Sequence, residues 1–501
     1  MCAARRATLA LVALAALTLL EAAPRAALAV GDDVVDPLAY SPLGAQEETR
    51  RRIVKRPDED RPPDQLRVPI LGRPLTIGGQ WELASRFDAD TRLGSRPDDD
   101  ELSIDQRLEV ELFYAATDDL FLYLEGKFFY RTVPWTEAGL RDDRFSVERG
   151  ESWIYLSDVF GSPFSLQVGR QRMNESSEWW WDEDLDAVRL HFDRGDVHLE
   201  TAVAEELVRL GDERDDVDPR RRDVFRVLSQ ATWQWFDRQY VEGFVHHQRD
   251  HSPTERPFTI VSRDLEDPVD ASLTWYGVGA NGRVKTPVGR VYYRSVVAFV
   301  RGHENVVDYD TDPFFGLRFV DTVNRHAVNG WATDVALTLS TDLPGELAFT
   351  AGYAFGSGES SSRREADRSF RQSELPDNNG RFRGVDRFRY YGELVEPNLS
   401  NLHIATVSLG ARFLRQSSVE LVYHAYEQVE PAPFLFGSSL RRAPTGRDRS
   451  IGHEWDVVLG VEEWDQVQVE LIGGVFRAGD AFGPAAGDLA YLGYLEVQFN
   501  F

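Results

Sequence analysis

The sequence predicts an all-β protein, a transmembrane antiparallel β-barrel of 18 strands. Three observations predict this fold. From Leu75 to the C-terminus, segments of about ten residues alternate apolar with polar side chains, the pattern of a strand with one face in lipid and one in a lumen. The connections between the segments are alternately short and long. The chain also begins with an export-like segment and ends on an aromatic residue.

The order of the segments supports each strand. Short connections such as Arg194-Gly195-Asp196 alternate with long ones such as 358–400. Tight turns at one end and long loops at the other are the layout of an outer-membrane barrel, whereas a soluble sandwich or propeller needs no such sorting. The 18 segments start near residues 75, 102, 120, 145, 164, 185, 197, 225, 239, 272, 289, 329, 345, 401, 418, 452, 466 and 489.

The N-terminal part divides into two predicted regions ahead of the barrel, 75–501. Residues 1–29 combine Arg5 and Arg6, an uncharged apolar run and the cleavage-site pattern Ala27-Leu28-Ala29, which predicts a signal peptide. Residues 30–74 are rich in Pro, Arg, Asp and Glu and predict a flexible periplasmic extension. The only cysteine is Cys2, so the mature chain has no disulfide. We therefore expect export to the bacterial outer membrane, with both termini on the periplasmic side.

The last segment alternates up to Phe501, the final residue. This ending resembles the C-terminal signal that the outer-membrane assembly machinery reads. The expected partners therefore include that machinery, together with outer-membrane lipid and lipopolysaccharide around a monomeric barrel.

The charge of the chain bears on its partners. The 501 residues hold 56 Lys plus Arg against 83 Asp plus Glu, a net charge of −27, which argues against a nucleic-acid partner. A barrel of this size encloses an aqueous channel, whose selectivity comes from the charged side chains that line it. By alternation, the inward-facing charged residues are Arg86, Arg107, Lys127, Arg149, Arg189, Arg226, Arg290, Arg294 and Arg412, and Glu82, Asp105, Glu109, Glu111, Glu125, Glu151, Glu200 and Asp334.

Arg170 and Arg172 break the alternation, because they fall on the same face as Leu166 and Val168. An arginine facing lipid costs ~2–4 kcal/mol at the membrane midplane. Either Gly169 marks a bulge that re-aims the two arginines, or they lie beyond the membrane part of the strand.

Several motifs carry a family resemblance over essentially Leu75 to Phe501. They are Val168-Gly169-Arg170-Gln171-Arg172, Trp179-Trp180-Trp181-Asp182, Leu185-Asp186-Ala187-Val188, Arg149-Gly150-Glu151-Ser152-Trp153, Phe370-Arg371-Gln372-Ser373, Tyr391-Gly392-Glu393-Leu394, Leu399-Ser400-Asn401-Leu402, Leu421-Val422-Tyr423-His424 and the run from Gly473 to Pro484. Their order and spacing are similar to those of the alginate export family of outer-membrane proteins.

The resemblance implies an 18-stranded barrel that exports an anionic polysaccharide through an arginine-rich constriction. Matched motif by motif, the positions of the family's constriction arginines correspond to Arg107, Arg149 and Arg172. Arg170 lies in the same motif as Arg172, and Arg387 resembles a fourth constriction arginine. Asp182 resembles an acidic residue beside the pathway. The sequence departs from the family where Glu470 and Ile472 replace two arginines and Glu82 replaces a basic residue.

Two loops carry further functional hypotheses. The segment 358–400 is arginine-rich and long enough to be functional, and we expect a lumen-facing gate over the alternative of a solvated extracellular loop. Trp179-Trp180-Trp181 is either a sugar-stacking platform or an interfacial aromatic anchor.

The sequence predicts no enzyme, cofactor or metal site. His246-His247, and His191 with His198, lack a metal-ligand spacing, and no G-x-S-x-G motif is present. The leading hypothesis is therefore passive export of an alginate-like uronate polymer, with periplasmic export partners as a further possibility. The alternatives are a general or small-anion porin, an outer-membrane enzyme such as a lipid hydrolase, and a soluble secreted β-protein.

Overall fold

The computed structural model describes residues 65–94, 100–136, 142–174, 179–207, 221–253, 256–262, 265–312, 317–359, 366–373, 375–464 and 466–501. The predicted signal peptide, 1–29, and residues 30–64 of the predicted extension lie outside this part of the chain. The next residues, Leu66–Ile70, form strand β1, which pairs with the start of β2.

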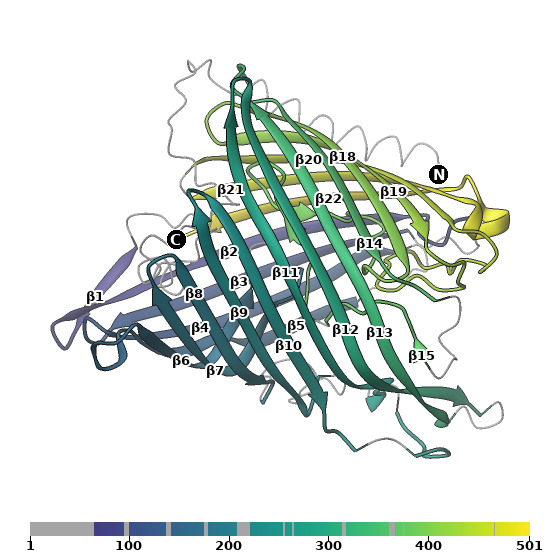
Figure 1. Cartoon of the computed structure of the whole chain (residues 1–501), viewed down its shortest axis with the longest axis horizontal. Helices are drawn as coiled ribbons and strands as arrows, with labels where there is room; N and C mark the ends of the chain where they lie inside the picture. Colours follow the sequence, from purple (N-terminus) through teal and green to yellow (C-terminus); the bar gives the residue numbers. More distant parts are fainter. Residues whose placement is uncertain are drawn as a thin grey trace. The chain divides into compact units, whose positions relative to one another are not determined.

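Eighteen antiparallel strands close into a barrel, which confirms the predicted fold (Figure 1). Each strand pairs with the next along the chain, and β2 pairs with β22 from Gln80↔Asn500 to Ala89↔Tyr491, which closes the ring. Their bounds are β2(Arg73–Ala89), β3(Glu101–Ala115), β4(Leu120–Thr136), β5(Asp142–Leu156), β6(Phe164–Asn174), β7(Asp182–Arg194), β8(Val197–Glu205), β9(Val224–Phe236), β10(Gln239–Asp250), β11(Val269–Thr286), β12(Gly289–Thr311), β13(Arg318–Thr341), β14(Ala348–Gly356), β18(Leu402–Phe413), β19(Ser417–Gln428), β20(Ser450–Trp464), β21(Val467–Ala478) and β22(Leu489–Asn500).

The alternation of the sequence becomes two faces of the wall. Val245 is 50% exposed and Leu337 52% exposed, while their neighbours Phe244 and Thr338 are buried. Apolar side chains therefore cover the outside, as lipid contact requires. No helix in the described residues is long and apolar enough to cross a membrane.

The predicted strand starts agree with the observed ones most poorly at β13. Its start was predicted near residue 329, but β13 begins at Arg318 and pairs with the far end of β12 up to Thr311. This end of the two strands carries charged residues such as Asp308 and Arg325. The alternation of apolar and polar side chains is therefore weak at this end, although the backbone hydrogen bonds between β12 and β13 continue.

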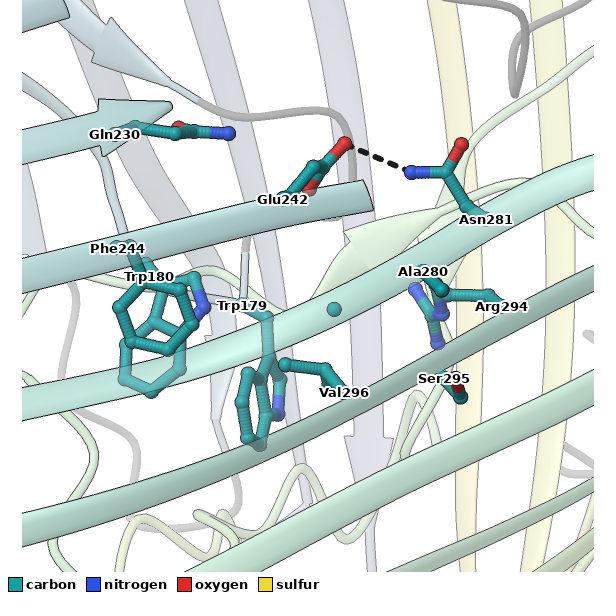
Figure 2. Close-up of a pocket in the computed structure, with 11 residues that line it drawn as sticks. Trp179, Trp180, Gln230, Glu242, Phe244, Ala280, Asn281, Arg294, Ser295 and Val296 are labelled. Atoms are coloured by element: carbon teal, nitrogen blue, oxygen red, sulfur yellow. Dashed lines mark hydrogen bonds between the residues drawn. The ribbon is translucent and has the colours of Figure 1, made fainter. Parts of the chain in front are cut away.

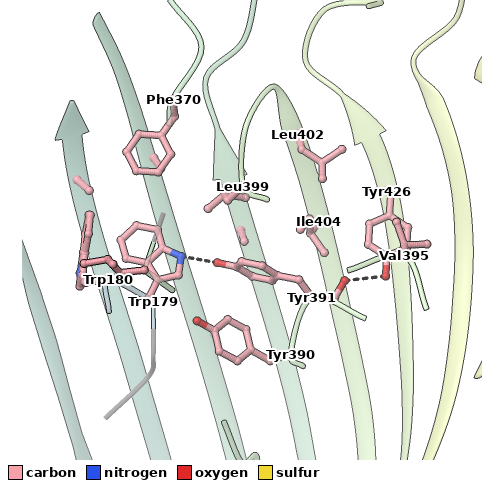
Figure 3. Packing of buried hydrophobic residues seen from close by; sticks show 14 of the residues in the cluster. Trp179, Trp180, Phe370, Tyr390, Tyr391, Val395, Leu399, Leu402, Ile404 and Tyr426 are labelled. Carbon is pink, nitrogen blue, oxygen red and sulfur yellow. Dashed lines mark hydrogen bonds between the residues drawn. The ribbon is translucent and has the colours of Figure 1, made fainter. Parts of the chain in front are cut away.

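The long segment between β14 and β18 folds into the barrel, as the gate hypothesis requires. It contains the short strands β15(Ala366–Asp367), β16(Asn379–Gly380) and β17(Phe388–Arg389). Phe370, Tyr391 and Leu399 are each at most 3% exposed. They pack against inward-facing residues of the wall, including Leu402, Ile404 and Tyr426 (Figure 3). One side of the lumen is therefore filled by this segment, which we call the lumen loop (residues 366–401).

Candidate functional site

The ends of β6 and β7 part from the neighbouring strand β5. The β5–β6 ladder stops at Ser152↔Arg170, whereas the β6–β7 ladder goes on to Asn174↔Asp182. At the point of separation Gly169 has φ +129°, and a Cβ atom there would lie 2.2 Å from the carbonyl oxygen of Ser152. Only glycine tolerates both conditions.

Beyond Gly169 the β6–β7 end faces the inside of the barrel. Nζ of Lys127, on the inward face of β4, lies 3.0 Å from Oδ2 of Asp184, and the backbone N–H of Asp182 donates to the carbonyl oxygen of Leu375 in the lumen loop (2.6 Å). The β6–β7 register runs through Gly169 without a bulge, so the bulge explanation is wrong. Instead, β6 leaves β5 at this point, and Arg170 and Arg172 pair with carboxylates.

Four basic and four acidic residues meet at this point. The guanidinium of Arg172 donates Nε to Oδ1 and Nη2 to Oδ2 of Asp182, at 2.5 and 2.8 Å. Nη2 of Arg149 lies 2.6 Å from Oδ1 of Asp186. Arg170 is buried, 3.9 Å from Asp186 and 3.8 Å from Glu206. We call the set the β6–β7 charge cluster: Lys127, Arg149, Arg170, Arg172, Asp182, Asp184, Asp186 and Glu206.

Arg107 lies on another part of the wall. It stands opposite Glu82 in the β2–β3 ladder and pairs with it, and its Nε lies 3.4 Å from Oε1 of Glu109. Nearby in the ring, Glu470 of β21 stands opposite Glu496 of β22. We call Glu82, Glu109, Glu470 and Glu496 the acidic wall. Among the described contacts, Arg107 is the one arginine that pairs with Glu82 and Glu109.

Arg387 lies at the tip of the lumen loop, between β16 and β17. The backbone N–H of Val385 donates to Oγ of Ser418 (2.8 Å) and holds the tip against β19. Arg387 donates its backbone N–H to Oδ1 of Asp386 (3.0 Å) and Nη2 to the carbonyl oxygen of Asn379 (3.4 Å). Burial raises the pKa of Asp386 to about 7, with Arg381 opposing the shift.

The six sequence-predicted site residues thus occupy three places. Arg149, Arg170, Arg172 and Asp182 come together in the β6–β7 charge cluster. Arg107 lies beside the acidic wall, and Arg387 lies at the loop tip.

The tryptophan motif is buried and packs against the lumen loop (Figure 3). Nε1 of Trp179 donates to the hydroxyl of Tyr391 (2.7 Å), and that hydroxyl donates to Oδ2 of Asp334 (2.9 Å). The ring of Trp180 lies 4.0 Å from that of Phe244, centroid to centroid. All three tryptophans are at most 5% exposed, so both hypotheses for this motif, the sugar-stacking platform and the interfacial anchor, are wrong.

A pocket that the sequence reasoning missed lies on the wall beside Trp179 and Trp180 (Figure 2). Its polar side chains come from four neighbouring strands, β9 to β12, and the amide of Asn281 donates to Oε1 of Glu242 (2.8 Å). Arg294 donates to Asp334 (3.1 Å) and its guanidinium lies 4.6 Å from the centre of the Tyr390 ring. Strand alternation alone places Arg294 inward, but the tryptophans that complete the pocket come from a distant loop.

Comparisons with known proteins agree with this architecture. A family model described as "Alginate export" matches residues 73–492. The chain is 25% identical to the alginate production protein AlgE of Pseudomonas aeruginosa, over 72% of this chain and 76% of the relative. It is 23% identical to AlgE of Pseudomonas syringae pv. tomato, over 70% and 75%. Its fold is similar to the crystal structure of P. aeruginosa OccK5 (OpdH), with TM-score 0.50, 11% identity and coverage of 85% and 98%.

Proposed function

The chain belongs to the alginate export family, and from this membership we propose that it is a passive channel for export of an anionic, uronate-type polysaccharide. The family and the closed porin-like barrel place the chain in the outer membrane as a channel, which is not an enzyme. The relatives from P. aeruginosa and P. syringae are named for alginate production. Alginate is therefore the first polymer to test.

The observation that carries the proposal is the β6–β7 charge cluster. A guanidinium presents five N–H donors in a planar fork that matches a carboxylate. Arg172 uses two of these donors on Asp182, and its side chain remains 29% exposed. A uronate carboxylate can therefore share or replace the aspartate as a partner, and the next sugar can meet Arg149, whose side chain is 25% exposed.

The neighbouring pocket is lined by Gln230, Glu242 and Asn281 beside Trp180. Trp180 is 5% exposed and its ring packs on Phe244, so it presents no open face to a sugar ring. We propose that the polymer contacts the charge cluster as it passes the lumen loop.

The remaining partners are proposed on the same basis. Phe501 follows β22 and is held at the barrel seam, where Gly79 and Phe501 exchange two backbone hydrogen bonds of 3.0 Å. We propose that the assembly machinery reads this last strand and that lipopolysaccharide surrounds a monomeric barrel. A signal peptide at 1–29 and periplasmic export partners complete the proposed pathway.

Planar-bilayer recording of the refolded protein tests the proposal. We expect a reversal potential that shows anion preference, and current block by polyuronate but not by neutral dextran of equal length. Cation preference without polyuronate block contradicts the proposal. Anion conduction without block favours the small-anion porin instead.

A further inference from the structure

The hairpin of β7 and β8 brings two histidines and two carboxylates onto one face. Its two-residue turn includes Gly195 at φ +57°. The turn sets the register so that His191 stands opposite Glu200 and Asp193 opposite His198. Residues directly opposite in adjacent strands point to the same side. All four side chains face inward and are at most 8% exposed.

The side-chain distances have the pattern of a metal site with one orienting residue. Oδ1 of Asp193 lies 2.5 Å from Nδ1 of His198, which directs the other ring nitrogen, Nε2, toward Glu200. Nε2 of His198 lies 3.6 Å from Oε2 of Glu200, and Nδ1 of His191 lies 3.8 Å from the same oxygen. These separations exceed a hydrogen bond and approach the roughly 3.3 Å between two ligands of a tetrahedral Zn²⁺ ion.

The donor set selects the kind of ion. Two imidazoles and one carboxylate suit first-row transition metals, whereas Ca²⁺ and Mg²⁺ prefer oxygen ligands alone. In such sites, the ring nitrogen of a histidine that does not bind the metal usually donates a hydrogen bond to a carboxylate, the place that Asp193 takes here. From this geometry we infer that the β7–β8 hairpin end binds a divalent transition metal ion such as Zn²⁺ through His191, His198 and Glu200, with Asp193 as the positioning residue.

Two other neighbours shape this site. Nη2 of Arg189 donates to Oε2 of Glu200, so a bound metal shares this carboxylate with a cation. The ring of Tyr155 lies 6.1 Å from that of His191 in an edge-to-face arrangement and packs against the imidazole. Three protein ligands leave a fourth coordination position for water or a solute. Replacing Arg189 by Gln removes the competing cation and is expected to tighten metal binding.

Metal titration of the refolded full-length barrel, prepared without a polyhistidine tag, tests the inference. We expect one equivalent of Zn²⁺ or Co²⁺ per chain, removable by a chelator, with the absorption bands of tetrahedral Co²⁺. His198→Gln should lower the affinity at least about tenfold, and Asp193→Asn about ten- to a hundredfold. His403→Gln is the matched control, because His403 lies on β18 and contacts Tyr353 (2.6 Å).

The result that overturns the inference is a wild-type barrel without stoichiometric metal, or a folded His198→Gln barrel with the affinity of the wild type. Folding of each variant is checked by its heat-modifiable electrophoretic mobility. If His198→Gln does not fold, the wild-type stoichiometry and Asp193→Asn still decide the question. The channel proposal is unaffected by either outcome, because polyuronate block is measured in chelator.

Discussion

The β6–β7 charge cluster and the acidic wall differ in their share of basic side chains. In the cluster, Lys127, Arg149, Arg170 and Arg172 meet the carboxylates of Asp182, Asp184, Asp186 and Glu206, and Lys127 also lies 3.4 Å from Glu125. In the acidic wall, Glu82 and Glu109 share Arg107, and Glu470 stands opposite Glu496. Under the proposed function, a uronate carboxylate replaces a carboxylate of the cluster, whereas the acidic wall offers it one arginine among four carboxylates.

This difference explains why the net charge of −27 says little about the pore. A polyanion meets individual pairs of side chains at close range, and charges beyond about 10 Å are screened in physiological salt. Under the proposed function, passage of a uronate polymer depends on how strongly the cluster holds carboxylates relative to the repulsion at the acidic wall.

The largest effect is expected from removing the two partly exposed arginines of the cluster. Arg149→Gln with Arg172→Gln leaves Asp186 and Asp182 without their main cationic partners. Charge-assisted hydrogen bonds contribute ~1.5–3 kcal/mol each, so polyuronate block should weaken about tenfold or more. Bilayer current measures it, with Arg415→Gln in a short turn as the control. Unchanged block would place the polymer elsewhere.

A smaller effect is expected where the lumen loop meets the tryptophan motif. Tyr391→Phe removes the hydroxyl that accepts from Trp179 and donates to Asp334, and the loss of these two buried hydrogen bonds costs ~1–3 kcal/mol. The lumen loop should loosen, seen as more frequent current fluctuations and faster amide exchange at 388–395. Tyr276→Phe is the matched control, since Tyr276 stacks on Phe299 and lies outside this contact. Equal exchange in both variants would contradict the structural role of Tyr391.

A pH effect is expected at the loop tip. Burial raises the pKa of Asp386 from 3.8 to about 7, so the docked loop favours the protonated acid. Docking is strongest below about pH 4 and weakens as the pH rises to about 7. Fluctuations of the current should therefore increase over this range. Asp386→Asn should remove that dependence, and an identical pH profile in the variant would refute it.

The smallest effect is expected from one charge of the acidic wall. Glu470→Gln removes one carboxylate of the acidic wall without deleting a cation, and the anion-to-cation permeability ratio should rise by at most roughly two- to threefold, the effect of one fully ionised lumen charge. The ratio comes from reversal potentials in a salt gradient. Glu427→Gln, on the exposed face of β19, is the control and should leave the ratio at the wild-type value. A fall in the ratio for Glu470→Gln would reverse the assigned role of the acidic wall.

The strand layout could be predicted because lipid and lumen impose a period of two on every segment that crosses the membrane. The pairing of Arg107 with Glu82 also follows from a strand register. The β6–β7 cluster could not be predicted in this way. It depends on where the β5–β6 ladder stops, on the backbone of Gly169, and on acidic partners brought in from β7.

The lumen loop shows the same limit. Its length and arginine content indicate a functional segment, but the contacts of Tyr391 with Trp179 and Asp334 join residues far apart in the sequence. The β7–β8 hairpin with His191 and Glu200 is more predictable from sequence than the lumen loop and less predictable than the strand layout. A tight turn at Gly195 fixes the register, so the pairing of these residues was within reach of sequence reasoning, although the spacing of the histidines alone did not indicate it.

The most direct test of the central claim is release of labelled polymers from proteoliposomes that contain the barrel. If the β6–β7 charge cluster selects uronate carboxylates, alginate oligomers leave faster than neutral dextrans of the same length. This difference disappears in the barrel with Arg149→Gln and Arg172→Gln. Equal release of both polymers from the wild-type barrel, or an unchanged preference in the variant, would contradict the account.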